Sequence, residues 1–329
     1  MPRLRYAAGR LGSGSDVLGL DDEMSRDHDW GCRLTLLVDG ADGDAVPLIS
    51  GLLERELPGS WRGQPVRFPV TWDPSLSHNV EVATVAGFAA SRLGADPVAG
   101  LSVPDWLILT GQSVLEVTAG PVFTDQTREL APVRSLLAWY PVDVERYVLA
   151  CGWQKISEEM AMVGRTASRG DEVGSRLISA RLVAGLTCLA FALSRRWAPY
   201  PKWRGTVFTT LPTAADLAAP LAAAAGAADW RAREDGLAAA SETLLAAQRA
   251  RGLPAPGNAV IPFWDRPYRT IDEAISRALL TDVTDPLVTG LPVGIGSIEQ
   301  WADNVAILAH PGRRRALKTI YVPQGRRST

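Results

Sequence analysis

The spacing of apolar positions predicts that the first part of the chain mixes short strands with helices. Alternating or β-branched apolar runs, bounded by Gly, Pro and Asp, favour strands, and apolar residues at helical spacing favour helices. In chain order we predict strands over 34–39, 66–72 and 79–85 and helices over 49–56 and 87–93. We predict 113–118 to be a further short strand or a loop.

From about Pro141 the pattern changes to longer segments with helical periodicity. The predicted helices cover 143–163, 171–196, 213–226, 230–251, 271–280 and 297–308. Pro132 and Pro141 bracket a short apolar stretch, which favours a domain boundary there. We therefore predict an α/β N-terminal domain, a mixed sheet with helices, over 1–135 and an all-α helical-bundle domain over 136–329.

Composition and charge narrow the classes of partner. The 329 residues are 47% hydrophobic and 21% charged, which is typical of a folded water-soluble protein. The 34 basic and 36 acidic residues give a net charge of −2. This balance provides no general attraction to nucleic acid or to an anionic membrane, so we expect neither as a partner.

The cysteines and the apolar runs indicate a cytoplasmic protein. Cys32, Cys151 and Cys188 are widely spaced, which favours neither a disulfide framework nor a zinc site. We see no run of about 18 apolar residues and expect no membrane span. We expect the Arg-rich end, 313–327, to be a solvated tail.

A turn of small residues near the N-terminus is suited to binding phosphate. Small side chains let backbone N–H groups approach an anionic triphosphate, and serine hydroxyls can donate to it as well. The candidate residues are Gly12, Ser13, Gly14 and Ser15.

Two carboxylates follow this turn at a spacing suited to metal binding. Asp27 and Asp29 are two residues apart and precede an apolar run at 34–38. On a strand such side chains share a face, so both could reach Mg²⁺ that also holds substrate phosphates. The alternative is an acidic surface loop, since residues 21–23 are acidic as well.

This layout resembles the signature of the polymerase-beta-type nucleotidyltransferase superfamily. That signature places a Gly-Ser turn before an Asp-x-Asp or Asp-x-Glu pair on the next strand. Eleven residues separate Ser15 from Asp27, and thirteen separate Ser13 from Asp27. The resemblance implies that Ser13 and Ser15 touch the triphosphate while Asp27 and Asp29 hold the metal ions.

Two-metal phosphoryl transfer usually needs a third acidic group. Glu81 is our first candidate, because an acidic residue between apolar neighbours on a strand is costly unless something pairs with it. Glu116 has the same local pattern and is the second. The alternative for Glu81 is the solvated face of an edge strand.

Further polar groups in the helical part are candidates for substrate binding. Arg165 could meet phosphate, and Asp171 or Glu172 could bind the acceptor. The alternative for the two acids is capping of the helix that begins there. Lys202, after Pro199, could present a point charge to phosphate, unless this segment is a structural turn with Trp203 buried.

Over nearly the whole chain the sequence also resembles the family called domain of unknown function 4037. The resemblance rests on the motifs around 12–15 and 25–31, and on those at 105–107, 115–123, 139–144, 164–165, 170–175, 180–182 and 199–203. It implies an N-terminal nucleotidyltransferase domain followed by a helical substrate domain, similar in plan to kanamycin nucleotidyltransferase.

We therefore expect a Mg²⁺-dependent nucleotidyltransferase. It would move a nucleoside monophosphate, with ATP as the expected donor, to a hydroxyl or similar acceptor on a small molecule and release pyrophosphate. Asp27 and Asp29 would bind the ions, and Glu81 would complete the metal site or act as base.

Two alternatives remain open at this point. One is a nucleotide-binding regulatory or antitoxin-like protein whose fold has lost turnover, motivated by the uncertain third carboxylate. The other is an enzyme that modifies a protein or transfer RNA; the near-neutral charge argues against the RNA version.

Overall fold

The computed structural model describes residues 4–26, 29–71 and 73–322. The chain folds into two compact units. The first comprises Met1–Ser102, Leu109–Ala138 and Ala309–Arg315, and the second comprises Val103–Ile108, Trp139–Leu308 and Ala316–Thr329. A mixed α/β part is thus followed by a helical part, as predicted, but each unit also takes in a short segment from elsewhere in the chain.

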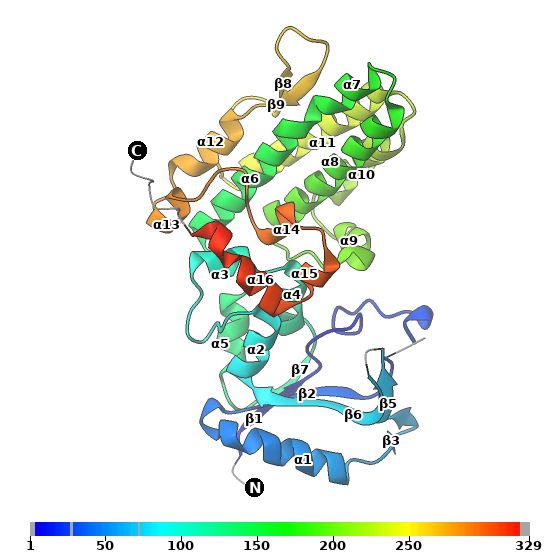
Figure 1. Cartoon of the computed structure of the whole chain (residues 1–329), viewed down its shortest axis with the longest axis vertical. Coiled ribbons are helices and arrows are strands. Elements are labelled where there is room, and N and C mark those ends of the chain that lie inside the picture. The colour runs from blue at the N-terminus through cyan, green and yellow to red at the C-terminus, as the bar shows by residue number, and fades with distance from the viewer. Residues whose placement is uncertain (1–3, 27–28, 72, 323–329) are drawn as a thin grey trace. The chain divides into compact units, whose positions relative to one another are not determined.

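The first unit is built on a five-stranded mixed sheet (Figure 1). Its strands lie in the order β5-β6-β2-β1-β7, with β2 and β6 parallel and the other neighbours antiparallel. The bounds are β1 Tyr6–Gly9, β2 Arg33–Val38, β5 Arg67–Val70, β6 Asp73–Thr84 and β7 Val122–Asp125. The three predicted strands correspond to β2, β5 and β6, and β6 is longer than predicted.

Helices lie on both faces of this sheet (Figure 1). Helix α1 (Val46–Glu56) packs along β6, and α2 (Val85–Leu93) lies on the other face together with α4 (Gly111–Thr118). The remaining short elements are η1 Glu23–Arg26, η2 Gly40–Ala45, β3 Ser60–Trp61, β4 Gln64–Pro65, α5 Leu130–Leu136 and α16 Pro311–Ala316.

The prediction of a strand or loop over 113–118 was wrong, because these residues form most of α4. Thr110 and Ser113 make a capping box: each side chain accepts a hydrogen bond from the other residue's backbone N–H. Val114 and Val117 are fully buried along one side of the helix. The cap and the burial outweigh the strand preference of the valines.

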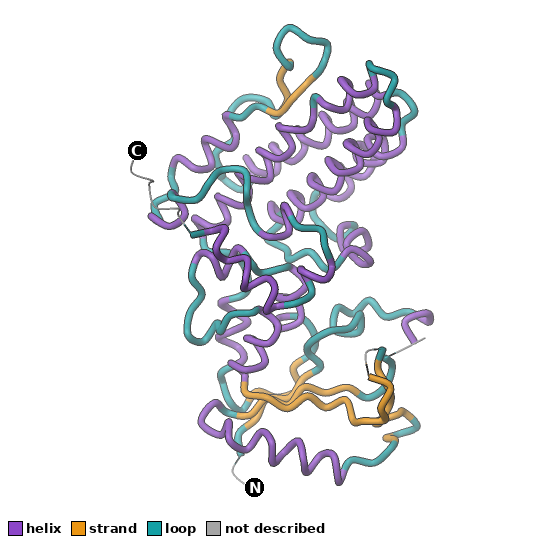
Figure 2. Tube along the Cα trace, viewed as in Figure 1, coloured by secondary structure: helices purple, strands orange, loops and turns teal. Residues whose placement is uncertain are grey.

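The second unit is dominated by long helices (Figure 2). The main ones are α6 Val142–Met160, α7 Met162–Ala167, α8 Glu172–Leu193, α10 Ala214–Gly226 and α11 Trp230–Ala250. Smaller elements are α3 Val103–Leu107, α9 Pro201–Phe208, β8 Val260–Pro262, β9 Arg269–Ile271, α12 Ala274–Thr281, α13 Pro286–Thr289, α14 Ile298–Trp301, α15 Val305–Leu308 and η3 Leu317–Tyr321. The predicted helix over 297–308 is thus two short helices.

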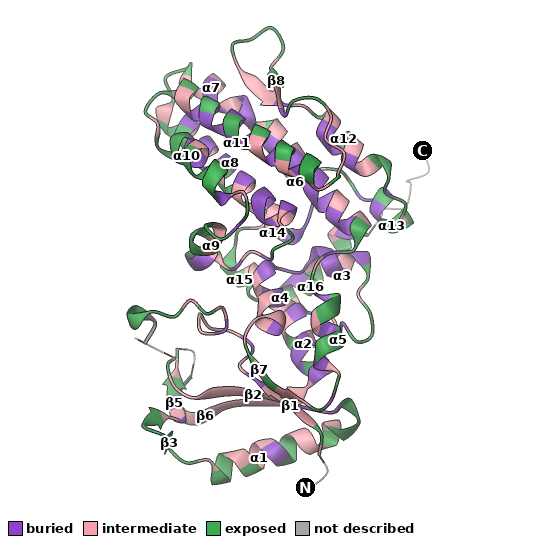
Figure 3. Cartoon of the chain, turned by 180° about the vertical axis from the view of Figure 1, so that it is seen from behind, coloured by how far each residue is buried: buried purple, intermediate pink, exposed green. Residues whose placement is uncertain are grey.

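The core of this unit lies between α6, α8, α10 and α11. Trp153 of α6 is fully buried, and its indole N–H donates a 2.7 Å hydrogen bond to the buried Gln248 of α11. Buried and exposed residues alternate along these helices, as amphipathic helices require (Figure 3).

Within the described residues, one helix, α8, is long and apolar enough to cross a membrane by length and composition. Leu182, Leu186 and Leu189 of this helix are buried in the core. A core helix of a water-soluble protein passes the same test, so the finding is consistent with a soluble protein.

The prediction of a solvated Arg-rich tail was wrong at Arg314. This residue of α16 is 1% exposed and belongs to the first unit. Its guanidinium donates hydrogen bonds to the carbonyl oxygens of Arg92 (2.6 Å) and Leu93 (3.3 Å), where α2 ends. A cation is favoured at the C-terminal end of a helix, which accounts for its burial there. Residues 323–327 of the predicted tail lie outside the described part of the chain.

Candidate functional site

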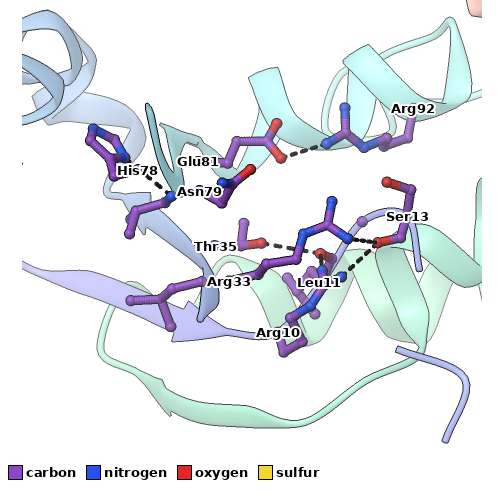
Figure 4. A pocket seen from close by; sticks show the side chains of 12 residues that line it. Arg10, Leu11, Ser13, Arg33, Thr35, His78, Asn79, Glu81 and Arg92 are labelled. Carbon is purple, nitrogen blue, oxygen red and sulfur yellow. Dashed lines mark hydrogen bonds and ion pairs between the residues drawn. The ribbon is translucent and has the colours of Figure 1, made fainter. Parts of the chain in front are cut away.

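A pocket of about 250 Å³ lies in the first unit, where the turn after β1 meets the parallel pair β2 and β6 (Figure 4). It is lined by Arg10, Leu11, Gly12, Ser13, Arg33, Leu34, Thr35, His78, Asn79, Val80, Glu81 and Arg92. Three guanidinium groups and one carboxylate therefore share one small space, which is a chemistry suited to an anion.

The register of the sheet brings Glu81 into this pocket. Thr35 of β2 and Glu81 of β6 are partners in the parallel ladder, so their side chains lie on the same face. The buried hydroxyl of Thr35 donates a 3.3 Å hydrogen bond to the carbonyl oxygen of Leu11. This bond ties the turn after β1 to the strand that faces Glu81.

The turn itself depends on glycine. Gly12 has φ +86° and donates a 2.7 Å hydrogen bond from its N–H to the carbonyl oxygen of Glu116. A Cβ at Gly12 would lie 3.4 Å from a guanidinium nitrogen of Arg92. That distance is an ordinary van der Waals contact, so it is the positive φ that favours glycine at this position.

The predicted phosphate-binding residues divide into two pairs. Gly12 and Ser13 line the pocket, whereas Gly14 and Ser15 are not among the lining residues. The hydroxyl of Ser15 donates a 2.6 Å hydrogen bond to Asp21. Ser15 thus supports the loop that follows the turn.

Arg10 holds the turn in shape. Its guanidinium donates to the carbonyl oxygens of Leu11 (2.5 Å) and Ser13 (2.7 Å), and Nε and Nη2 both donate to the carboxylate of Asp16. A planar fork that meets a carboxylate with two hydrogen bonds is the most directional ion pair available to a protein. The charge of Arg10 is accordingly neutralised by Asp16.

Arg92 lies between the two candidate third carboxylates. Its Nη2 is 2.5 Å from Oε2 of Glu81, and its Nε is 3.5 Å from Oε2 of Glu116. Burial raises the pKa of Glu116 above its usual value, although Gln112, Arg92 and Arg314 act in the opposite direction. Glu81 lines the pocket and Glu116 does not, which ranks Glu81 first.

The Asp pair is described only in part. Asp27 lies outside the described residues. Asp29 lies in a bend with φ +55°, four residues before β2, and not on the strand as predicted. Its carboxylate accepts hydrogen bonds from the N–H (2.6 Å) and the hydroxyl (2.9 Å) of Thr71. These bonds tie the bend that contains Asp29 to the segment after β5.

The charges of Asp29 and Glu81 both act on Arg33. Burial lowers the pKa of Arg33, the neighbouring Arg10 lowers it further, and Asp16, Asp29 and Glu81 oppose the shift. Residues 4–26, 29–71 and 73–322 contain no group of three or more His, Cys, Asp or Glu residues that could hold a metal. A three-carboxylate metal site would need Asp27 as a member.

The candidates of the second unit have structural partners there. Asp171 caps α8 by accepting a 2.8 Å hydrogen bond from the N–H of Gly174, and Glu172 pairs with the fully buried Arg233. Arg165 lies over the ring of Phe263, with 5.6 Å between guanidinium carbon and ring centroid. The capping alternative is confirmed for Asp171.

Lys202 lies near the start of α9, with its ammonium 5.0 Å from the ring centroid of Trp203. Trp203 is 9% exposed, and its indole N–H donates a 2.8 Å hydrogen bond to the hydroxyl of Tyr200. Trp203 is therefore a packed residue, and the phosphate-binding role of Lys202 stays a prediction.

Sequence reasoning missed the cations of the pocket. Arg33 is two residues before Thr35 on β2, so the alternation of the strand could have placed its side chain on the pocket face. Arg92 had no comparable signal, because its position depends on the packing of α2 against α4 and the sheet.

Comparison with known families adds one match. Residues 106–204 match the model of the family described as domain of unknown function (DUF4037), which confirms the family resemblance over just under a third of the chain. The matched segment includes Glu116, Arg165, Asp171, Glu172 and Lys202, but not the pocket residues. No curated protein and no solved structure matches the chain.

Proposed function

We propose that the protein is a cytoplasmic Mg²⁺-dependent nucleotidyltransferase that uses a nucleoside triphosphate, with ATP as the expected donor. It would transfer the nucleoside monophosphate to a hydroxyl or similar group of a small molecule. The observation that carries the proposal is the pocket in which the Gly12-Ser13 turn, Glu81 and three arginines meet. The three cysteines, all within the described residues, are unpaired thiols, which supports a reducing compartment.

The residues present fit a magnesium ion by donor chemistry. Asp27, Asp29 and Glu81 would supply carboxylate oxygens, the ligands that Mg²⁺ prefers together with substrate phosphates. When bound, the ion would neutralise charge on the phosphates and polarise the reacting phosphoryl group. The hydrogen bonds that Thr71 donates to Asp29 would hold that carboxylate in place.

The chain's own groups would then position the reactants. The Gly12-Ser13 turn allows close approach of the phosphates, and the arginines stabilise their negative charge. The acceptor oxygen attacks the α-phosphorus in line with the leaving group. A new O–P bond forms, the bond from the α-phosphorus to its bridging oxygen breaks, and pyrophosphate leaves. The acceptor's proton passes to Glu81 or to water.

A nucleotide-binding protein without turnover is the second candidate. The close ion pair between Glu81 and Arg92 favours it, because that carboxylate already has a cation partner. Under this proposal Glu81 stays with Arg92 when nucleotide binds, and Mg²⁺ adds little to the affinity.

The test is thermal stabilisation by each of the four nucleoside triphosphates, with and without Mg²⁺, followed by a search for pyrophosphate release with panels of hydroxyl acceptors. A ligand that binds only the folded state stabilises it by about 2.7 kcal/mol at one hundred times its dissociation constant. We expect a Mg²⁺-dependent shift that is lost in Asp27→Asn/Asp29→Asn and kept in Asp42→Asn, which changes an exposed acid of η2. Full metal-dependent pyrophosphate release by Asp27→Asn would contradict the enzyme proposal.

A further inference from the structure

Arg33 differs from the other two arginines of the pocket in its place in the fold. It lies on a strand of the sheet, whereas Arg10 follows β1 and Arg92 is on α2. Arg33 is the first residue of β2 and pairs in register with Asn79 of β6. In Figure 4 its side chain extends into the pocket toward Ser13, opposite the pair of Glu81 and Arg92. Its position is therefore fixed by the sheet and not by a loop.

The three arginines differ in how their charges are neutralised. Arg10 has two hydrogen bonds to Asp16, and Arg92 pairs with Glu81. Nη1 of Arg33 donates a long hydrogen bond, 3.4 Å, to the carbonyl oxygen of Ser13. Among the described residues, no ion pair includes Arg33.

The positive charge of Arg33 is unfavourable in this pocket unless an anion binds next to it. The side chain of Arg33 is partly buried, and both burial and the nearby Arg10 lower its pKa. Because Asp16 neutralises Arg10, the main cost is the partial burial of the Arg33 charge without a carboxylate in contact, which a bound anion would offset. The charges of Asp16, Asp29 and Glu81 favour the charged form of Arg33, but none of these carboxylates forms an ion pair with it.

The pocket has room for such an anion. Its volume of about 250 Å³ corresponds to about eight water-sized groups, at about 30 Å³ each. That is close to the non-hydrogen atoms of two linked phosphate groups. Gly12 and Ser13 leave the side of the pocket near Arg33 without bulky side chains.

We propose that Arg33 is the residue that binds the phosphate chain of the ligand, as a forked donor to two phosphate oxygens. A guanidinium matches the geometry of phosphate better than an ammonium does. The assignment to the donor's triphosphate rests on the proposed function. The phosphate-binding role of Arg33 does not, since a free polyphosphate has the same chemistry.

The experiment measures dissociation constants by calorimetry for ATP, tripolyphosphate and adenosine in Mg²⁺, with the full-length wild type, Arg33→Met, Arg33→Lys and Arg55→Met. Arg55 is exposed on α1 and serves as the matched control. We expect Arg33→Met to weaken ATP and tripolyphosphate about 10- to 100-fold, the range for loss of a charge-assisted hydrogen bond. Arg33→Lys should recover part of that loss, and Arg55→Met should match the wild type.

The outcomes separate this inference from the proposed function. Equal ATP affinity in wild type and Arg33→Met would overturn the role of Arg33 and leave nucleotidyl transfer standing. Arg33-dependent binding of tripolyphosphate without binding of any nucleoside triphosphate would support the role of Arg33 and overturn the donor assignment. Binding of neither ligand by the wild type would overturn both.

A second measurement tests the role of Arg33 in the wild type, so that it does not depend on the folding of an Arg33 variant. In the wild type, phenylglyoxal modification of Arg33 and Arg55 is followed by mass spectrometry with and without tripolyphosphate. We expect at least a tenfold slowing at Arg33 and none at Arg55, because a bound phosphate covers the guanidinium. Equal modification of Arg33 in both conditions would overturn the inference.

Discussion

The guanidinium of Arg314 donates a 2.6 Å hydrogen bond to the backbone carbonyl oxygen of Arg92, which is 222 residues earlier in the chain. Arg92 in turn pairs with Glu81 in the pocket. A residue close to the C-terminus therefore supports the helix end from which one wall of the candidate site is built.

We predict that Arg314→Ala destabilises the first unit by about 2–4 kcal/mol. The substitution leaves the carbonyl oxygens at the end of α2 without their donor and removes a side chain that is 1% exposed. Urea unfolding of the full chain measures the change. The exposed neighbour Arg315 is the matched control, and Arg315→Ala should stay within about 0.5 kcal/mol of wild type. Equal effects of the two substitutions would show that Arg314 does not support α2.

Glu81 distinguishes the enzyme from the protein without turnover. If Glu81 binds the metal, Glu81→Gln should remove most of the gain in ATP affinity that Mg²⁺ provides, by at least about tenfold, because a carboxylate ligand is lost. Affinity measured without Mg²⁺ should not fall, because the substitution removes a negative charge from the pocket and releases Arg92. Glu56→Gln, at the exposed end of α1, is the control. An unchanged Mg²⁺ dependence in Glu81→Gln would favour the second candidate function.

Part of this site was predictable from the sequence because its signals are local. Gly12 requires a positive φ, and Glu81 is an acid between two valines on a strand, so both could be identified from their neighbours. Strand β2 and helices α8 and α11 were predicted for the same reason, since their apolar periodicity lies within one segment.

The features that could not be predicted from the sequence depend on contacts between segments that are distant along the chain. Arg314 was assigned to a solvated tail because its neighbours are charged, whereas its burial comes from packing against α2. Asp29 was placed on a strand from its spacing, but it lies in a bend and its carboxylate accepts hydrogen bonds from Thr71 of a distant segment. Such partners are specified by the tertiary structure, and the residues adjacent in sequence carry no signal for them.

The buried Glu145 of α6 gives a prediction for the second unit. It is 2% exposed and accepts hydrogen bonds from Trp139, Arg195 and Arg251 at 2.6–3.0 Å. We predict that Glu145→Gln costs about 2–3 kcal/mol of unfolding free energy at pH 7, because the mostly buried Arg251 loses its carboxylate partner, whereas the half-exposed Arg195 is solvated instead. Glu159→Gln, which breaks a more exposed pair with Arg181, should cost about 1 kcal/mol or less. Urea unfolding at pH 7 measures both, and equal costs would contradict the prediction.

The same residue should make the second unit sensitive to acid. Burial by itself would raise the pKa of Glu145, but the hydrogen bonds from Arg195 and Arg251 lower it overall. A carboxyl with a lowered pKa in the folded state contributes stability above its unfolded-state pKa, and that contribution is lost as the pH falls through the folded-state pKa. The difference between wild type and Glu145→Gln should therefore shrink as the pH falls below about 4.5. A difference that stays constant from pH 7 to pH 3 would show that charge is not its cause.

Glu116 should show the opposite dependence on pH in the first unit. Burial raises its pKa above 4.5, so the folded protein binds this proton more tightly than the unfolded chain does. The resulting stability is complete below the unfolded-state pKa and is lost as the pH rises through the folded-state pKa. Glu116→Gln removes the titration, so the wild type should lose stability relative to this variant as the pH rises from 4 to 8. Urea unfolding across this range tests the sign, with Glu56→Gln as control. A relative gain in wild-type stability with rising pH would mean that the ion pair with Arg92 outweighs the burial of Glu116.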